Sequence, residues 1–306
     1  MLFPRVAVDA DGSIQLIGSN TTVSTDTGTN LISGVISTSG ETGGSITVVG
    51  DRVGLLGADL NASGMEGGGD IRIGGDYQGQ GDISNASRTL IDANSTIAAD
   101  ALLNGDGGRV IIWANEATRF DGRISAQGGT QSGNGGFVEV SGLNFLDFQG
   151  SADTSASNGE FGSLLLDPTD IEIVETGGTA SLEDVLAADL NPGTRSVINA
   201  DLINAAVGDV ILQATNDIIF SADINIAAFG IGLIANAGND IDVNSNITTN
   251  GGDVVLNGNF DGVEAGAVSI QNSEINTLGG NLHASGQAGA GSLGNDGVEI
   301  GGGKHN

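Results

Sequence analysis

Short phrases in which two glycines precede alternating apolar and polar residues recur along the chain. The first four read GGSITVVG from Gly43, GGDIRIGG from Gly68, GGRVIIWA from Gly107 and GGFVEVSG from Gly135. Looser copies begin at Gly208, Gly251 and Gly279. Because successive side chains of a strand point to opposite sides, each phrase predicts a short strand with its apolar residues on one side.

A second phrase, one apolar residue followed by small residues and a glycine, precedes most of these copies. It occurs at Ile36, Leu60, Ile124, Ile247 and Ile275. Each repeat therefore holds at least two short strands joined by a turn. We expect the glycines at these turns, where the chain bends sharply and where a positive φ costs glycine little.

The spacing of the phrases gives the period of the repeat. Their first apolar residues, Ile46, Ile71, Val110, Val138 and Leu164, are separated by 25, 39, 28 and 26 residues. Val210 and Val254 are 44 residues apart, which fits two coils of about 22. A period in the twenties with two or three short strands predicts an all-β parallel β-helix, here of about 12 coils at about 4.8 Å each.

The apolar pairs of the phrases are expected to point inward and to stack into ladders along the solenoid. These pairs are Ile46/Val48, Ile71/Ile73, Val110/Ile112, Val138/Val140 and Val254/Leu256. With no cysteine in the chain, its stability must come from such ladders and from hydrogen bonds between coils.

The repeats are interrupted after Leu164, where glycine becomes scarce. The segment SLEDVLAADLN, from Ser181 to Asn191, combines a capping serine with apolar residues on one helical face. We therefore expect a β-helix array over 1–166, a linker with a short amphipathic helix over 167–194, and a second array over 195–306. The helix either packs on the solenoid or projects from it as a recognition element.

The charge of the chain argues against two classes of binding partner. The net charge is −29 with nine Lys and Arg residues, which argues against a surface that binds nucleic acid or anionic membranes. No run approaches the roughly 20 apolar residues of a membrane-spanning helix, so direct membrane insertion is not expected.

The block from Gly107 to Val174 resembles the repeat region of filamentous-haemagglutinin-like exoproteins, which are exported by two-partner secretion. The resemblance rests on GGRVIIWA, TRFDGRISAQGG, GGFVEVSG and LLLDPTDI. It implies a right-handed parallel β-helix forming part of a long rod on a Gram-negative cell surface. It also implies an outer-membrane secretion partner for the full-length parent.

The family's secretion domain carries an NPNG-type motif after a signal peptide. Neither feature occurs in this sequence, in which the only Asn-Pro is Asn191-Pro192. The chain therefore resembles an internal segment of such an exoprotein. Its expected localisation is the cell surface or the surrounding medium, as part of the longer protein.

Candidate binding residues are few. Arg109, Arg119 and Arg123 form the only local concentration of positive charge, near the single tryptophan, Trp113, and Phe120. One hypothesis is that an aromatic ring beside arginine donors binds an acidic glycan. The alternative, which we favour, is that Trp113 and Phe120 fill a corner of the coil.

A cation site has one candidate motif. Asp9 and Asp11 lie in DADGS, which resembles the start of a calcium loop but lacks the acid that closes it, because Asn20 stands at the twelfth position. We expect no cofactor beyond weakly bound calcium. His283 follows Leu282 in a strand phrase and is expected to face solvent.

We therefore expect a non-enzymatic rod segment of a secreted adhesin, with extracellular glycans or cell-surface proteins as its partners. One alternative is a polysaccharide-active β-helix lyase or hydrolase, which would need a pair of carboxylates in a groove. Another is the stalk of a contact-dependent toxin delivery exoprotein, whose toxin would lie outside this chain.

Overall fold

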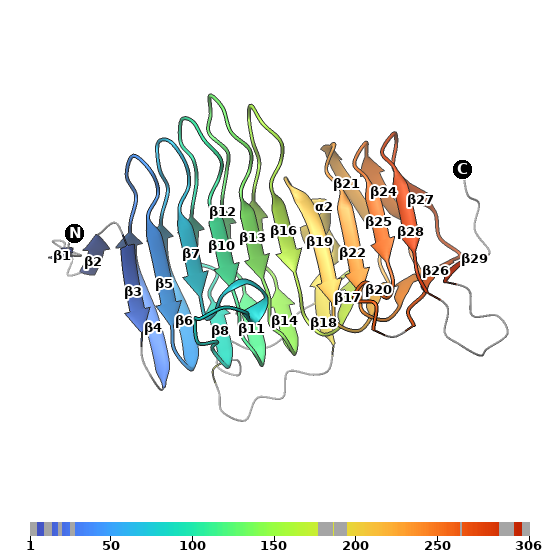
Figure 1. Ribbon diagram of the computed structural model, residues 1–306, viewed down its shortest axis with the longest axis horizontal. Helices are drawn as coiled ribbons and strands as arrows, with labels where there is room; N and C mark the ends of the chain where they lie inside the picture. The colour runs from blue at the N-terminus through green and yellow to red at the C-terminus, as the bar shows by residue number, and fades with distance from the viewer. Residues whose placement is uncertain are drawn as a thin grey trace.

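In the computed structural model the chain is an elongated parallel β-solenoid of about nine turns (Figure 1). The structure describes residues 5–8, 14–17, 20–24, 28–176, 186, 195–263, 265–287 and 297–301. Strands of successive turns lie side by side, and β1 (Arg5–Val8) and β29 (Val298–Gly301) mark opposite ends of the rod. The predicted parallel β-helix is confirmed.

One face of the solenoid is a single sheet of ten parallel strands, which we call the long sheet. Its order is β3 (Asn20–Ser24), β5 (Ser45–Val49), β7 (Asp70–Ile73), β10 (Arg109–Ile112), β13 (Phe137–Val140), β16 (Ser163–Leu166), β19 (Asp209–Ala214), β22 (Leu233–Ala237), β25 (Val254–Asn257) and β28 (Leu282–Ser285). Every glycine-pair phrase supplies one of these strands or the turn before it.

The other sides of the N-terminal half belong to a second sheet. One of its sides contains β2 (Ile14–Ile17), β4 (Thr29–Ser37), β6 (Arg52–Asn61), β8 (Arg88–Ile91), β11 (Ala117–Phe120) and β14 (Phe145–Phe148), with β1 antiparallel to β2 at the edge. The long strand β6 continues onto the next side, where β9 (Thr96–Ala98), β12 (Arg123–Ser125) and β15 (Ser151–Asp153) follow it.

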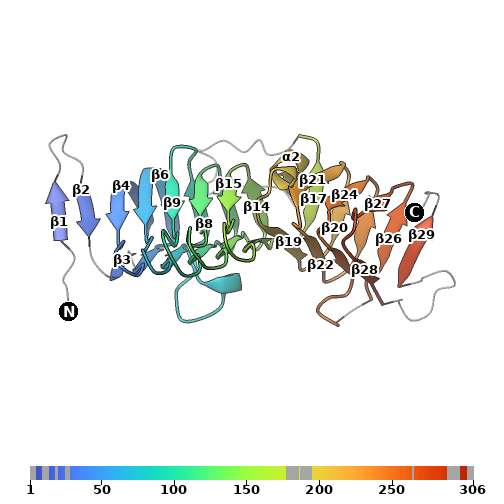
Figure 2. The same cartoon turned by 90° about the horizontal axis from the view of Figure 1, so that it is seen from above.

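Two smaller sheets form the corresponding sides of the C-terminal half (Figure 2). The first has the order β18 (Ser196–Asn199), β17 (Ile171–Val174), β20 (Ile218–Phe220), β23 (Ile241–Val243), β26 (Val268–Gln271) and β29. The second has the order β21 (Ile224–Phe229), β24 (Ile247–Asn250) and β27 (Ile275–Asn276).

The long sheet runs without a break past the point where the linker is predicted. β16 pairs directly with β19, so that Leu164 lies opposite Val210. β17 falls inside the predicted linker and is a solenoid strand paired with β20. The predicted helix from Ser181 to Asn191 lies outside the described residues, except for Leu186, whose carbonyl oxygen accepts a hydrogen bond from Arg52 Nη1 at 3.1 Å.

β18 and α2 (Ala200–Asn204) form an insertion at this junction. β18 pairs with β17 on the side facing the N-terminal half, where the Ser196 hydroxyl accepts a hydrogen bond from the Leu146 amide at 2.9 Å. Asn199 caps α2 by accepting from the Asp201 amide. Among the described residues no helix is long and apolar enough to span a membrane.

The core is a set of aliphatic ladders that follow the axis of the solenoid. Ile46, Ile71, Val110, Val138 and Leu164 lie opposite one another on adjacent strands. All five predicted inward pairs are fully buried, which confirms the alternation inferred from the phrases. Phe120 and Phe148 add a stacked pair inside the coil, with ring centroids 5.5 Å apart.

The four glycine pairs of the N-terminal half are required for close packing between coils and do not have positive φ. Gly69 and Gly108 have ordinary φ values, and a methyl group on either would collide with the carbonyl oxygen of the preceding coil's glycine, Gly44 or Gly69. Positive φ occurs at glycines shortly before these pairs, such as Gly67 and Gly105, and at the first glycine of two later pairs, Gly251 and Gly279. Positive φ therefore explains some of the turn glycines, and close packing explains others.

Many aspartates cap the backbone of the next coil at the turns. Asp217 Oδ1 accepts from the Asn239 side chain at 2.7 Å and from the Asp240 amide at 3.2 Å. Asp240 in turn accepts from the Ala267 amide at 2.7 Å. Because a buried turn amide needs an acceptor, these ladders give part of the acidic composition a structural role.

The structure has fewer turns than the 12 coils expected from the period. The 39-residue step between Ile71 and Val110 is one coil with a long loop, because these two residues lie opposite each other. The step of 44 residues between Val210 and Val254 is two coils, with Leu233 between them, as predicted.

Candidate functional site

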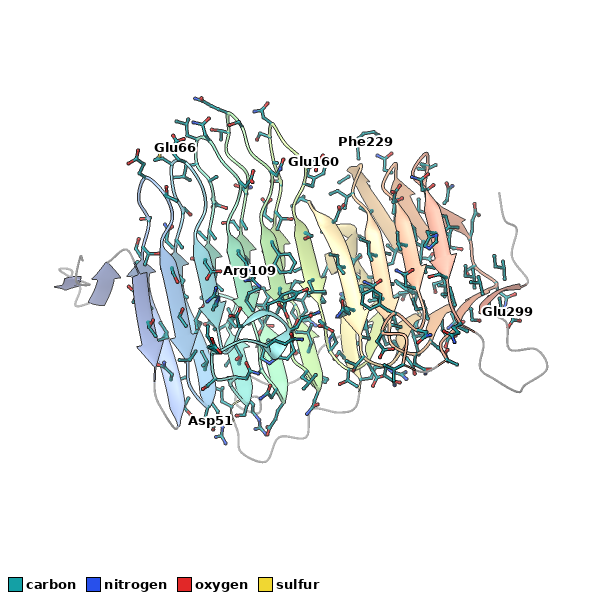
Figure 3. The ribbon with its side chains drawn as sticks, viewed as in Figure 1. Asp51, Glu66, Arg109, Glu160, Phe229 and Glu299 are labelled. Carbon is teal, nitrogen blue, oxygen red and sulfur yellow. The ribbon has the colours of Figure 1, made fainter. Side chains whose placement is uncertain are left out.

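The long loop of the 39-residue coil, residues 74–87, crosses the outer face of the long sheet. We call this loop the strap. It leaves β7 after Ile73, forms the short 3-10 helix η1 (Tyr77–Gly79) and enters β8 at Arg88. It stands out from the solenoid in Figure 2, and Figure 3 shows it passing close to Arg109.

Trp113 forms the support beneath the strap. Its side chain points outward from the end of β10 and is only 3% exposed, because the strap covers it. The indole lies so close to Gly75 and Gly79 that a methyl group on either glycine would collide with it. The ring nitrogen donates to Asn115 Oδ1 at 3.1 Å, and Asn85 Nδ2 ties the strap together by donating to the Gly79 carbonyl at 2.7 Å.

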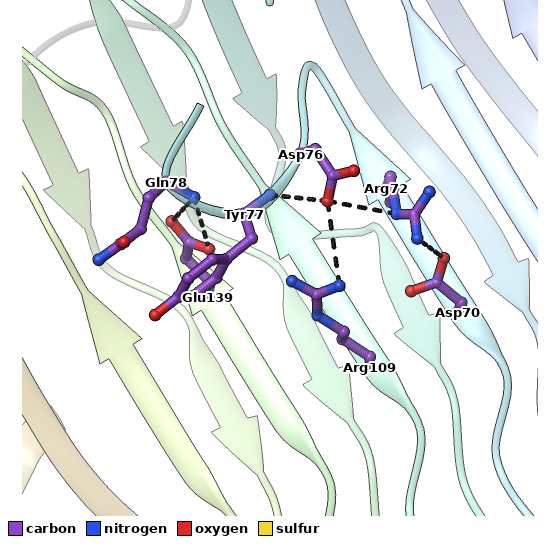
Figure 4. A network of polar contacts seen from close by, with 7 residues as sticks. All are labelled: Asp70, Arg72, Asp76, Tyr77, Gln78, Arg109 and Glu139. Atoms are coloured by element: carbon purple, nitrogen blue, oxygen red, sulfur yellow. Dashed lines mark hydrogen bonds and ion pairs between the residues drawn. The ribbon is translucent and has the colours of Figure 1, made fainter. Parts of the chain in front are cut away.

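Gln78 holds the strap against two acidic residues, Glu139 of β13 and Asp167, which directly follows β16. Figure 4 shows the contact with Glu139. Its amide donates to both carboxylate oxygens of Glu139, at 3.1 and 3.2 Å. Its side chain Nε2 donates to Asp167 Oδ2 at 3.1 Å, and Gln213 Nε2 donates to the same oxygen at 3.3 Å. Gln78 has a φ of 52°, a conformation that costs a non-glycine residue energy and persists only where contacts such as these hold it.

Burial under the strap changes the acidity of this pair. Burial raises the pKa of Glu139 to about 8, although the hydrogen bond from the Gln78 amide acts in the opposite direction. Burial also raises the pKa of Asp167 to about 6. The pKa of Tyr77 is raised, first by burial and then by the neighbouring charges of Glu139 and Asp167.

Tyr77 stands at the edge of the strap and is 39% exposed. The ring meets Phe137 edge-on at a centroid distance of 5.8 Å, and the guanidinium carbon of Arg109 lies 5.3 Å from its centroid. A guanidinium at this distance from an aromatic face is attracted to it. Phe137 and Arg109 project from adjacent strands, so Tyr77 covers the boundary between β10 and β13.

The charge of Arg109 is shared with aspartates. Its Nη1 lies 4.0 Å from Asp76 Oδ1, which also accepts the Tyr77 amide at 2.8 Å. Asp76 additionally lies 3.4 Å from Arg72 Nε, and Arg72 Nη2 lies 2.8 Å from Asp70 Oδ2 (Figure 4). The positive groups at this site are thus engaged by acidic partners within the protein.

Beside the strap, a groove of about 920 Å³ opens on the outer face of the long sheet. Its lining includes the glycine pairs of four successive coils, which have no side chains to fill it. The charged residues of the lining are Asp70, Asp106, Arg109 and Asp209, and its aromatic residues are Phe137 and Phe161. Tyr77 stands at the rim, because Arg109 and Phe137 both line the groove and both contact its ring.

The three arginines singled out from the sequence do not form one patch. Arg109 lies on the long sheet, whereas Arg119 lies on β11 and Arg123 on β12, which belong to other sides of the coil. Arg119 Nε is 2.9 Å from Asp121 Oδ2 and 3.7 Å from Asp147 Oδ2.

The structure places the two aromatic candidates in structural positions. Phe120 is fully buried inside the coil, and Trp113 is buried under the strap. His283 is exposed on the outer side of β28, as expected. Asp9 and Asp11 lie outside the described residues, and among the residues that the structure describes no group of three acidic or histidine side chains could hold a metal ion.

Sequence reasoning missed the strap residues Tyr77 and Gln78 and their partners Glu139 and Asp167. The alternation of GGFVEVSG places Glu139 on the outer side, where an acidic residue normally meets water. The available signal was the 39-residue spacing, which exceeds its neighbours by more than ten residues and so locates an extra loop. The position of the loop on the sheet depends on the contact between Gln78 and Glu139, which are 61 residues apart in sequence.

The arrangement suits binding in the open groove better than chemistry at the acidic pair. A carboxyl group that keeps its proton near neutral pH can serve as a general acid. However, Glu139 is fully buried beneath the strap, so a substrate in the groove does not reach it in this conformation. The exposed aromatic and acidic side chains of the groove are directly accessible to a ligand.

Comparison of the sequence with models of known protein families gives no match. Comparison with curated proteins gives none either.

Proposed function

We propose that the chain is a rod segment of a secreted cell-surface adhesin that presents the groove beside the strap to extracellular glycans or cell-surface proteins. The observation that carries this proposal is the uninterrupted ten-stranded long sheet, whose outer face holds an open groove along several coils. A parallel β-helix of about nine turns is suited to a stalk.

The surface chemistry supports an extracellular binding role. Aspartate and asparagine side chains occupy several turns, and the groove adds Phe161, which is 41% exposed. Aromatic rings with an apolar face and nearby polar groups are common in ligand-binding sites. The family resemblance of the block from Gly107 to Val174 supports the same role and an outer-membrane export partner for the parent protein.

A polysaccharide-cleaving enzyme is the second candidate, and the acidic pair Glu139 and Asp167 favours it. Both carboxyls have a raised pKa, and Gln78 bridges them. Catalysis would require the strap to move, since it covers Glu139. The rod of a toxin delivery exoprotein would share the same solenoid and differ only in what lies beyond this chain.

A bead-binding assay tests the adhesin proposal. Beads coated with the folded chain are incubated with cultured cells, and beads coated with heat-unfolded chain serve as the control. We expect the folded chain to be retained above the control and the retention to fall after the cells are treated with periodate, which oxidises glycans. Equal retention of folded and unfolded chain on all cell types would reject adhesion.

A further inference from the structure

We infer that the groove beside the strap binds an uncharged glycan chain lengthwise, with a sugar ring stacked against Tyr77 and Phe137. This inference rests on the proposed function and names its ligand class. It departs from the hypothesis that arginines beside Trp113 bind an acidic glycan, because the structure separates those arginines and covers the tryptophan.

The groove offers little positive charge to an anionic sugar. Among the residues that the structure describes, Arg109 is the only basic one in the lining, and its guanidinium lies against the ring of Tyr77 and 4.0 Å from Asp76 Oδ1. Charged groups give up water on binding and need a partner in exchange. A carboxylate or sulfate on the ligand would have to compete with Asp76 for Arg109.

The lining holds three carboxylates, Asp70, Asp106 and Asp209, which repel anionic ligands and can accept hydrogen bonds from hydroxyl groups. Asp70 and Asp209 are half-buried, and burial raises the pKa of both. Asp209 Oδ1 accepts from the Gly232 amide at 2.8 Å, which leaves further acceptor positions on this carboxylate. Sugar hydroxyls donate to such acceptors without adding negative charge, whereas a uronate would be repelled by them.

Aromatic residues flank the row of glycines in the groove. Because Phe137 pairs with Ser163, Gly136 lies opposite Gly162, and Phe137 follows this row whereas Phe161 precedes it. Tyr77 contacts Phe137 on the strand side of the row. Tyr77 and Phe161 are 39% and 41% exposed, so part of each residue is accessible to a ligand. The C–H faces of a hexose are apolar and its edge carries hydroxyls, a shape that matches rings flanked by carboxylates.

The bare glycine pairs set the direction of the ligand. Gly44, Gly69, Gly108 and Gly136 follow one another across β5, β7, β10 and β13, so the groove runs along the solenoid axis, across the strands. Adjacent strands are about 4.8 Å apart, which is close to the length of one hexose unit in an extended chain. Successive sugars can therefore meet equivalent positions of successive coils.

The chain carries its own probe for this site. Trp113 is its only tryptophan and Tyr77 its only tyrosine, and they lie beneath and at the edge of the strap. Trp113 emission is titrated with tetramers of three kinds: uncharged glucose or N-acetylglucosamine, cationic glucosamine, and anionic galacturonate. We expect saturable binding of an uncharged tetramer and at least about tenfold weaker binding of galacturonate.

Variants locate the binding. Tyr77→Ala and, on the other side of the groove, Phe161→Ala should each weaken binding of the uncharged tetramer by about tenfold, while Tyr77→Phe stays within about threefold. Phe161→Ala keeps the test valid if Tyr77→Ala fails to fold. Phe229→Ala is the matched control, since Phe229 is an exposed aromatic residue of β21, outside the groove lining.

The outcomes separate this inference from the adhesin proposal. Preferential binding of galacturonate would overturn the uncharged ligand class, and uncharged binding unaffected by Tyr77→Ala and Phe161→Ala would overturn the groove. Adhesion would stand in both cases. Tight binding of glucosamine alone, unaffected by these variants, would indicate attraction to the negative surface and would likewise overturn the inference. Absence of binding to every tetramer together with absence of cell retention would reject both proposals.

Discussion

The backbone amide of Gln78 donates hydrogen bonds to both carboxylate oxygens of Glu139, at 3.1 and 3.2 Å, across 61 residues of sequence. This contact joins a loop of one coil to the outer face of a later coil. It brings a carboxyl group out of water and holds Gln78 at positive φ. The strap, the acidic pair and the rim of the groove all depend on it.

The pH dependence of stability should reflect Glu139. Its pKa is 4.5 in the unfolded chain and about 8 in the folded chain, so between these values the folded state binds more protons. Stability therefore falls as pH rises through this window, by a total on the order of 5 kcal/mol. Asp167 adds a decrease between 3.8 and about 6.

Glu139→Gln removes the larger of these two ionisations. We expect the variant to show a flatter profile of unfolding free energy and to be more stable than the unaltered chain at pH 9, as measured by urea denaturation. Glu160→Gln, at an exposed loop position, is the control and should follow the unaltered chain. A profile for Glu139→Gln that parallels the unaltered chain from pH 5 to 9 would show that Glu139 is not the titrating group.

Trp113→Ala should destabilise the chain by about 3 to 5 kcal/mol, because it empties the space between β10 and the strap. Phe229→Ala, at a side chain that is 78% exposed, should change stability by less than about 0.5 kcal/mol. Circular dichroism during denaturation is the measurement, since the variant lacks its fluorophore. Unchanged melting of Trp113→Ala combined with loss of glycan binding would instead make Trp113 a ligand contact.

Gly69→Ala tests whether the glycine pairs are required for close packing. The new methyl group would meet the Gly44 carbonyl oxygen and the Ala62 backbone, so we expect a loss of at least about 2 kcal/mol or failure to fold. Gly57→Ala is the matched control, because Gly57 has a φ of 65° but open space around it. It should cost about 1 kcal/mol through φ alone. Equal costs at the two positions would contradict the packing explanation.

The turn ladders predict a difference between two replacements of Asp217. Asp217→Ala leaves the Asp240 amide and the Asn239 side chain without their acceptor, at a cost of about 1 to 3 kcal/mol. Asp217→Asn keeps an oxygen at the same place and should recover most of this loss. Thermal unfolding of the two variants is the measurement. An equal decrease in the melting temperature of both would assign the effect to charge.

The sequence predicted the solenoid because its repeat is local. Each phrase contains a strand of four residues, its inward pair and the following turn. Ile46/Val48 and the later pairs could therefore be placed inward without knowledge of the fold. The register between neighbouring strands could be predicted too, since equivalent phrases lie opposite one another. The close packing of Gly69 on Gly44 could not be distinguished from positive φ, because both conditions select glycine.

The candidate site could not be predicted to the same extent because it is not local. Arg109, Arg119 and Arg123 are close in sequence, but the ten residues from the first to the second carry the chain around a corner of the coil. In contrast, Tyr77 and Phe137 are 60 residues apart and in contact. β18 also lies beside β14, and no repeat phrase predicts this contact.

The most direct test of the adhesin account is binding of the purified chain to a broad glycan array, with and without calcium, while the same polysaccharides are assayed for cleavage. The adhesin account predicts saturable binding to at least one glycan and no new reducing ends or unsaturated products, and the further inference predicts that the bound glycans are uncharged. Cleavage of any bound polysaccharide, abolished by Glu139→Gln, would contradict the adhesin account and make the acidic pair under the strap a catalytic site.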